Sequence, residues 1–374
     1  MKEPFPYDMR AVLGAAGKGF SLKKITAGTV FLLLGYVLYV AFTYLALMID
    51  GVRFDYIWQS YGLFPVKIYS FDSVIAIITQ GIGIVLAVLA ISQSILAGAV
   101  ISFEEIRGDY FYSIFDSVKF TFKRTPTLVL GFLSLGAFIG FVWLLGFLTG
   151  LISRIPEIGE IAIGLFYLVP IFITFVLTLF IIFVGLAGIV LLPVVIAAQK
   201  ENELFGPLLH LFSVLIKEPL RFFWYLAVTS VIAKVASFVL AYVFYRSIQF
   251  SHMVLKSGGG DTIDRMFNAA FNMLPLNSPI LGFFCNIFPG ITFGFSFSRF
   301  GYGGDKSIGA ILLAISFFIL FVVIGGYMVS VISTGMARGY TVIRRMKDDY
   351  LITEEDPMKS HEDYVNPPFK TDKS

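Results

Sequence analysis

The sequence predicts an all-α, polytopic integral membrane protein with about six transmembrane helices. Of its 374 residues, 57% are hydrophobic and only 14% are charged, whereas a soluble domain carries about 25% charged residues. The apolar residues gather in long uninterrupted runs, and about 20 such residues carry a helix across about 30 Å of hydrocarbon. None of the runs alternates polar with apolar residues, so the strands of a membrane barrel are excluded.

Six apolar runs mark the predicted spans. In chain order they cover about 25–48, 74–101, 127–151, 170–198, 222–245 and 308–336. The fourth belongs to a longer run, 161–198, which Pro170 divides into a short interfacial lead-in and the crossing itself. Because no water solvates the backbone inside a bilayer, each run must form a helix that pairs its own N–H and C=O groups.

The Lys and Arg residues indicate the orientation of the spans. The N-terminal segment, the loops after spans two and four, and the C-terminal segment hold 19 of the 28 Lys and Arg residues, and the opposite side holds 8. Since basic loops remain in the cytoplasm, both termini are predicted to be cytoplasmic. We expect a multi-pass protein of the plasma (inner) membrane of a prokaryote. Residues 351–374 are polar and are predicted to form a disordered cytoplasmic tail.

The chain shows signs of a threefold repeat. An amphipathic segment, a basic residue and a proline precede span three (Arg124-Thr125-Pro126) and span five (Lys217-Glu218-Pro219), and a weaker copy precedes span one. Such segments are typical of helices that lie in the membrane interface. The predicted repeat is interfacial helix, span, outer loop and span, over about 5–107, 108–200 and 201–350, which together form one transmembrane domain, 1–350. The alternative is that amphipathic cytoplasmic loops occur in any polytopic protein.

The second half of the fourth span and the segment that follows it show a distinctive order of features. They contain a proline near the end of the span, a short acidic turn, an amphipathic helix, and a basic residue and proline before span five: Pro193, Glu201 and Glu203, 204–216, Lys217 and Pro219. This order resembles a group of poorly characterised six-span prokaryotic membrane proteins, which includes the membrane domain found ahead of some glycerophosphodiester phosphodiesterases. The catalytic phosphodiesterase domain is absent from this chain, so the resemblance implies architecture and not activity.

Three polar residues inside the spans are candidate site residues. Lys234 lies within span five, where a charged side chain costs about 2.5–3.5 kcal/mol. Either it serves a substrate, lipid-headgroup or proton site, or it snorkels to the membrane surface. Gln80 and Gln93 give span two a polar side, which would line a cavity or form hydrogen bonds between helices. These three residues are the predicted cavity or lipid contacts.

No cofactor or metal site is predicted. His210, His252 and His361 are far apart in the sequence, and His252 with the single Cys285 would supply fewer ligands than a closed zinc site needs. The net charge of +3 gives no reason to expect nucleic-acid binding. No nucleophile motif is visible, so the chain is predicted not to be an enzyme.

The outer loop 246–307 is the distinctive insertion. It contains a glycine run, Gly258 to Gly260, then an amphipathic stretch from Ile263 to Leu274, and then an apolar segment, 281–300, that Pro289 interrupts. We predict that 281–300 is an interfacial cap or a re-entrant hairpin, because a seventh span would place the basic C-terminal segment outside. The loop would offer a docking surface to other membrane proteins.

These features favour a non-enzymatic scaffold or accessory subunit of a membrane complex. Its expected partners are membrane lipids and, through the loop 246–307, other membrane proteins. The alternative is a transporter or lipid-handling protein with a central cavity near Lys234, where the three repeats would meet. An enzyme that acts on lipid within the membrane is a third interpretation, which the lack of buried acid–base pairs in the predicted spans disfavours.

Overall fold

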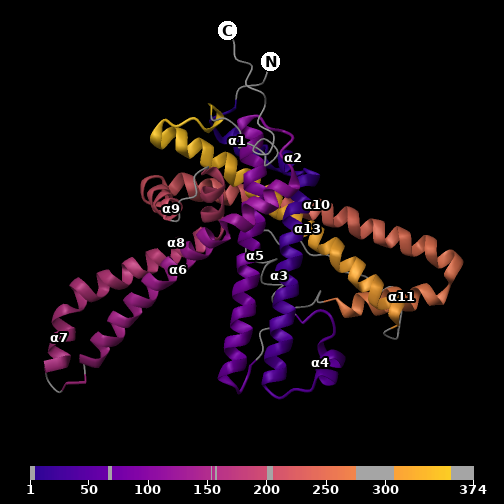
Figure 1. The fold of residues 1–374 in the computed structure, drawn as a ribbon, viewed down its shortest axis with the longest axis horizontal. Helices are drawn as coiled ribbons and strands as arrows, with labels where there is room; N and C mark the ends of the chain where they lie inside the picture. The colour runs from indigo at the N-terminus through magenta and orange to yellow at the C-terminus, as the bar shows by residue number, and fades with distance from the viewer. Residues whose placement is uncertain are drawn as a thin grey trace, which may run out of the picture. The chain divides into compact units, whose positions relative to one another are not determined.

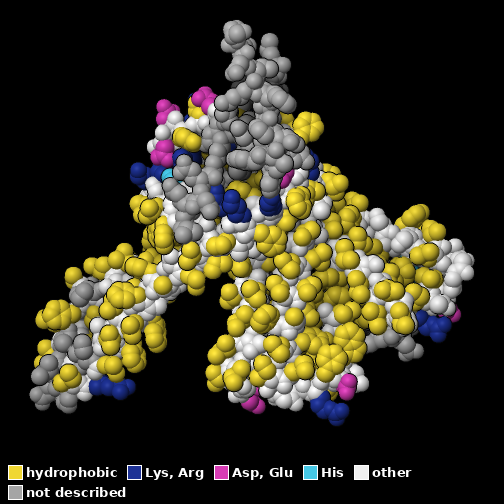
Figure 2. Space-filling view, in the orientation of Figure 1, with side chains coloured by type: hydrophobic (Ala, Val, Ile, Leu, Met, Phe, Trp, Pro, Cys, Tyr) yellow, Lys and Arg dark blue, Asp and Glu magenta, His cyan; other side chains and the backbone are white. Residues whose placement is uncertain are grey.

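The computed structural model describes residues 5–65, 70–152, 154–155, 158–199, 205–274 and 307–354. Over this part of the chain it contains helices and no strand, and six helices are long and apolar enough to cross a membrane (Figure 1). These are α3 (Leu22–Ile49), α5 (Val74–Arg107), α6 (Ile114–Ile152), α8 (Phe172–Ala198), α10 (Pro219–Gly259) and α13 (Ile308–Asp348). The predicted all-α, multi-pass architecture is confirmed. In Figure 2, hydrophobic side chains cover the visible face of these helices, as a lipid environment requires.

In the described parts of the chain, six shorter helices accompany the spans. They are α1 (Met9–Leu13), α2 (Ala15–Gly19), α4 (Phe54–Tyr61), α7 (Ile158–Phe166), α9 (Gly206–Lys217) and α11 (Asp261–Met273). The helices α1, α2 and α9 fall where interfacial lead-ins were predicted ahead of spans one and five. Pro219 is the first residue of α10, a position where its missing N–H leaves no bond unmade.

Pro170 interrupts the fourth apolar run, as predicted. A π-helical turn, Tyr167–Ile171, joins α7 to α8, and Val169 within it has non-helical torsions (φ −118°, ψ 41°). Val169 is the residue before the proline, where the proline ring disfavours helical torsions. The lead-in and the crossing are therefore separate helices.

Several helices extend beyond their predicted limits, and α5 and α13 end at Arg107 and Asp348 instead of about 101 and 336. The lead-in ahead of span three is continuous with the span, because α6 runs from Ile114 to Ile152 with Pro126 inside it. Proline is tolerated in membrane helices when neighbouring groups satisfy the freed carbonyl. In addition, α10 continues past the predicted end at Tyr245 to Gly259, so the first part of the loop 246–307 is helical.

The chain divides into two compact units, and each is described by itself. Unit 1 comprises Met1–Val12, Ile95–Leu226 and Met336–Ser374, and unit 2 comprises Leu13–Ser94 and Ala227–Gly335. The boundaries fall inside α5, α10 and α13, so neither unit coincides with one predicted repeat. The threefold repeat stays a prediction.

In unit 1, α8 packs against α6 and α9. The two ends of the described chain also meet in this unit. The hydroxyl groups of Tyr7 and Thr353 share a hydrogen bond of 2.6 Å, and the guanidinium of Arg345 lies 4.0 Å from the centre of the Tyr7 ring. The N-terminal and C-terminal segments therefore lie together in unit 1, and the cytoplasmic location of both termini stays a prediction.

Unit 2 has a hydrophobic cluster at each end. The α2 cluster consists of Ala15, Ile25, Ala233, Tyr327 and Val331. The α11 cluster consists of Phe64, Ile248, Phe267, Ala270, Leu274, Ala314 and Phe317. Helix α10 runs from Ala233 in the α2 cluster to Ile248 in the α11 cluster, whereas α13 runs from Ala314 in the α11 cluster to Val331 in the α2 cluster. The two helices are therefore antiparallel. The predicted segment 281–300 lies outside the described residues, but Leu274 before it and Ala314 after it belong to the same cluster.

Small residues let the helices of unit 2 approach closely. The Ser94 hydroxyl on α5 donates a hydrogen bond of 3.1 Å to the Gly28 carbonyl on α3. A Cβ added to Gly35 of α3 would lie 2.5 Å from the Cβ of Ala90, and one added to Gly326 of α13 would lie 2.9 Å from the Ile25 carbonyl oxygen. Close backbone approach of this kind is what holds helices together where lipid removes the hydrophobic driving force.

Candidate functional site

The turn after α10 brings α11 back alongside it. Gly260 joins the two helices with φ of +53°, a left-handed conformation that favours glycine. Asp261 and Asp264 lie in the first turn of α11, where negative charge is favourable beside the free N–H groups of the helix start. Phe267 and Ala270 of α11 are buried in the α11 cluster. Together, residues 246–273 form the α10–α11 hairpin.

The carboxylate of Asp264 on α11 holds the two helices together through contacts with His252 and Lys256 of α10, and we call these contacts the hairpin lock. One oxygen of Asp264 lies 2.8 Å from Nε2 of His252, and the other lies 2.6 Å from Nζ of Lys256. His252 and Lys256 are one turn apart on α10, so both reach the same acid. The His252 ring also contacts the Phe267 ring, with centroids 4.9 Å apart. The hydrogen bond from Lys256 lowers the pKa of Asp264; partial burial opposes this shift, and the hydrogen bond with His252 adds to it.

A cavity in unit 2 lies beside the hairpin. It has a volume of about 300 Å³ and is bounded by α4, the turn that follows it, α11 and the start of α13. Its lining consists of Trp58, Ser60, Tyr61, Gly62, Leu63, Phe64, Ala269, Asn272, Met273 and Ile311. None of these described lining residues has an acidic or basic side chain. We call this space the α4–α11 cavity.

Two tyrosines of α3 hold the turn that forms one wall of the α4–α11 cavity. The Tyr44 hydroxyl donates to the Gly62 carbonyl, and the Tyr36 hydroxyl donates to the Leu63 carbonyl at 3.2 Å. Gly62 closes α4 with φ of +55°, and its N–H donates to the Trp58 carbonyl at 3.0 Å. The wall is therefore fixed by hydrogen bonds as well as by the packing of Phe64.

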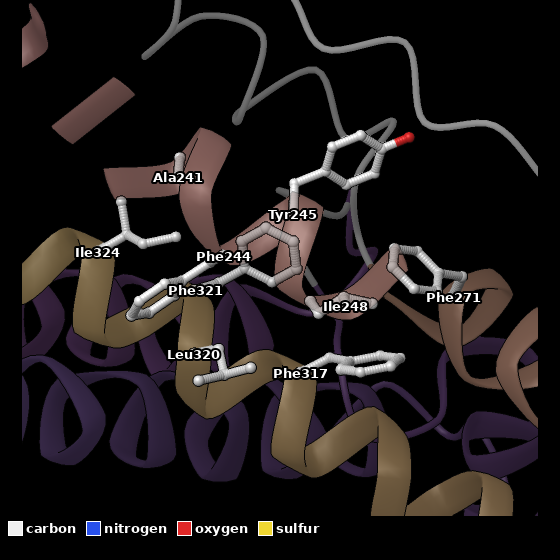
Figure 3. A pocket seen from close by; sticks show the side chains of 9 residues that line it. All are labelled: Ala241, Phe244, Tyr245, Ile248, Phe271, Phe317, Leu320, Phe321 and Ile324. Carbon is white, nitrogen blue, oxygen red and sulfur yellow. The ribbon is translucent and has the colours of Figure 1, made fainter. Parts of the chain in front are cut away.

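A smaller cavity of unit 2 is a packing gap. It measures about 20 Å³, which is room for about one water molecule. Figure 3 shows its lining side chains from α10, α11 and α13, with the Tyr245 hydroxyl turned away from the gap. That hydroxyl accepts a hydrogen bond of 2.9 Å from Nε2 of Gln249. The walls offer an apolar surface only, so we assign no ligand to this gap.

The three residues predicted as cavity or lipid contacts line neither of these cavities. Lys234 is half-buried and follows Ala233, a member of the α2 cluster, so it is level with the start of α3 and not with the midpoint of α10. Gln80 and Gln93 are buried in α5. A lipid contact for these residues stays a prediction.

A fully buried lysine was missed by the sequence analysis. Lys24 donates from Nζ to the Lys18 carbonyl at 3.1 Å and to the Thr334 hydroxyl at 3.3 Å. Ser330 also donates to the Gly19 carbonyl, at 2.6 Å. The last carbonyls of α2 therefore receive donors from Lys24 and α13, and a cation is favourable at that end of a helix. In the sequence, Lys24 looks like any basic residue at the start of a span.

Unit 1 contains a buried ion pair that was also missed. Glu104 and Arg107, fully buried near the end of α5, approach to 2.6 Å. Arg107 also donates to the Ala198 carbonyl at 2.9 Å, and Arg124 donates to the Gln199 carbonyl at 3.4 Å. Burial, followed by the nearby Glu104 carboxylate, raises the pKa of Tyr112. The only signal in the sequence is a Glu and an Arg three residues apart at a helix end.

Among the residues that the structure describes, no three His, Cys, Asp or Glu side chains come together in a way that could hold a metal ion. The acid, imidazole and amine of the hairpin lock are engaged with one another. Comparisons with protein-family models, with curated proteins and with solved structures find no match to this chain.

Proposed function

We propose that the chain is a non-enzymatic scaffold or accessory subunit of a membrane complex that binds a second membrane protein through the α10–α11 hairpin. The observation that carries the proposal is an exposed apolar face on α10, in the hairpin that Asp264 holds together. Phe250, Met253 and Val254 lie on one face of α10 beyond the predicted span, and they are 64%, 61% and 52% exposed. Met and Phe are enriched in the buried centres of protein interfaces.

The packing of unit 2 supports a scaffold over a transporter. The hydroxyls of Ser94 and Ser330 donate hydrogen bonds to backbone carbonyls of α3 and α2. The Lys24 ammonium also donates to a carbonyl of α2. Helix α3 contacts α5 and α13 at glycines that leave no room for a Cβ. A substrate pathway needs polar groups that face an open space, whereas these groups serve contacts between helices.

Site-specific photo-crosslinking in native membranes tests the proposal. A photoreactive residue at Met253 is expected to capture one discrete protein, and Val254→Glu is expected to abolish that product because it places a charge in the apolar interface. Leu186 of α8, equally exposed at 64%, is the matched site. It is expected to capture lipid only. If Met253 also captures lipid only, the face rests on the bilayer and the scaffold role is wrong.

A further inference from the structure

We propose that the α4–α11 cavity binds an uncharged, hydroxyl-rich small molecule of about monosaccharide size. The inference goes beyond the scaffold role and does not depend on it. It starts from the volume of about 300 Å³, which is at the lower limit of ligand pockets in proteins, about 300–1,000 Å³. A single water needs only about 10–15 Å³ on the same measure. The space therefore suits a small organic molecule.

The lining selects against a charged ligand. Among the described residues that line it, none is Asp, Glu, Lys, Arg or His. An ion that entered would give up its hydration without meeting an opposite charge, which is costly. Asp264 of α11 pairs with His252 and Lys256 of α10. These side chains are not part of the cavity lining, so they supply no charge to an occupant.

Hydrogen-bonding groups in the lining favour an occupant that both donates and accepts. The indole N–H of Trp58 is a donor, and the Ser60 hydroxyl and the Asn272 amide can each donate and accept. None of these three side chains forms a hydrogen bond with another described residue. The rings of Trp58 and Tyr61 add apolar faces beside these groups. A molecule that carries several hydroxyls on a compact carbon skeleton matches both features.

The walls are set in place by contacts made outside the cavity. Tyr36 and Tyr44 hold the turn after α4, and Phe267 and Ala270 anchor α11 in the α11 cluster. The hairpin lock fixes the first turn of α11 against α10. A site whose walls are already ordered loses less freedom when a ligand binds. This preorganisation is what distinguishes the α4–α11 cavity from a gap that collapses around any occupant.

Tryptophan fluorescence of the purified full chain gives a direct readout. Trp143 and Trp224 are exposed residues of unit 1 and can be replaced by Phe, which leaves Trp58 as the one remaining Trp of the three. Glucose, galactose, mannose and inositol are the uncharged probes, and glucosamine and glucuronate are the charged ones. We expect at least one uncharged probe to change Trp58 fluorescence with saturation in the millimolar range. The charged probes are expected to bind at least about tenfold more weakly.

Variants on the two walls separate a specific site from a general effect of the probes. Asn272→Leu keeps the side-chain size and is expected to weaken binding about tenfold or more, and Ser60→Ala is expected to weaken it less. Tyr56→Phe is the matched control, because Tyr56 lies on α4, is 62% exposed and is not part of the lining. Its affinity should equal that of the parent, and thermal unfolding checks that each variant is folded.

Three results would overturn the proposal. One is the failure of every uncharged probe to alter Trp58 fluorescence. Another is equal or tighter binding of glucosamine or glucuronate. The third is an unchanged affinity in both Asn272→Leu and Ser60→Ala. The photo-crosslink at Met253 is a separate readout, so a failed titration leaves the scaffold proposal standing, and the reverse also holds.

Discussion

At the scale of single residues, Lys24 shows how a cation is kept inside a helical unit. Its ammonium donates to the Lys18 carbonyl and to the Thr334 hydroxyl. Lys24→Met keeps the length of the side chain but leaves these acceptors without their donor. A buried polar group that loses its partner costs about 1–3 kcal/mol, so we expect the unfolding free energy in detergent to fall by about that amount. Equilibrium unfolding followed by circular dichroism measures it.

Lys18→Met is the matched control for this prediction. Lys18 is exposed, and it contributes its backbone carbonyl, which the substitution leaves in place, to the contact with Lys24. Its stability should therefore stay close to that of the parent. Equal losses in the two variants would mean that Lys24 acts through net charge and not through its buried hydrogen bonds.

The Glu104–Arg107 pair makes a second prediction at this scale. Arg107→Met leaves the Glu104 carboxylate buried without its partner and removes the donor to Ala198. Breaking a buried ion pair from one side costs about 3–5 kcal/mol. We expect unit 1 to lose about that much stability, and the double variant with Glu104→Gln to recover part of the loss. A double-mutant cycle on unfolding free energies measures the coupling, and strict additivity would show that the pair is not formed.

Contacts of this kind are outside the reach of sequence patterns. Thr334, one acceptor for Lys24, is 310 residues away in the chain, and Ala198 is 91 residues from Arg107. In the sequence Lys24 lies at the start of a span and Lys234 lies within one, so Lys234 looks more deeply embedded. In the structure Lys24 is buried and Lys234 is only half-buried. The sequence singled out Lys234 and not Lys24, because burial within the protein depends on which helices become neighbours.

At the scale of elements, close helix approach at Gly326 is testable by adding one methyl group. A Cβ there would lie 2.9 Å from the Ile25 carbonyl oxygen and 3.1 Å from the Thr29 nitrogen. Because these are backbone atoms of α3, the helices must separate, and overpacking of this kind costs about 1–3 kcal/mol. Gly326→Ala is expected to lower the thermal unfolding temperature. Gly325→Ala should not, since its nearest contact is a Leu32 methyl at 3.4 Å.

The hairpin lock predicts a pH dependence at the same scale. The pKa of Asp264 is lowered from its ordinary value of 3.8, first by the hydrogen bond from Lys256. The lock therefore stabilises the hairpin fully above that ordinary value and is lost as the pH falls through the lowered pKa of the folded state. Amide hydrogen exchange of α11 should show protection that declines in that acidic range.

Two substitutions on α11 test the source of this pH dependence. Asp264→Asn is expected to reduce the protection of α11 already at neutral pH and to flatten its decline in acid, because the carboxylate that holds His252 and Lys256 is gone. Asp261→Asn, at the first residue of α11 and exposed, is the control. If Asp261→Asn flattens the decline as much as Asp264→Asn, the lock does not control the hairpin.

Most helices could be predicted because their positions depend on local properties of the sequence, namely apolar runs and prolines. The six spans are apolar enough to require a helix wherever they lie in the bilayer, and Pro170 and Pro219 mark helix boundaries by their chemistry alone. The sequence did not predict that α10 continues to Gly259 or that α6 is continuous with its lead-in. A helix can continue past the hydrocarbon when another element covers it. In α10 that element is α11, which shares the α11 cluster with Ile248. The α4–α11 cavity was missed for the same reason, since its walls come from three distant segments.

At the scale of the whole molecule, the layout makes a prediction about sidedness. The hydrogen bond between Tyr7 and Thr353 places both ends of the described chain together in unit 1. The α11 cluster of unit 2 joins α11 to the start of α13, so the chain leaves α10 and enters α13 at one end of that unit. These contacts fix which segments share a side. The excess of Lys and Arg predicts which side is the cytoplasm.

Cysteine labelling in intact cells tests the sidedness. Cys285 is the single native cysteine, so Cys285→Ser gives a background into which one new cysteine is placed. Tyr56→Cys on α4 should react with a membrane-impermeant maleimide in intact cells, because α4 belongs to the predicted outer side and residue 56 is exposed. Ser374→Cys should react only after the membrane is opened. The reverse pattern would invert the orientation and leave the helices as described. Labelling of both positions in intact cells would require an even number of crossings between them, whereas the six spans place five there, so that result would contradict six spans.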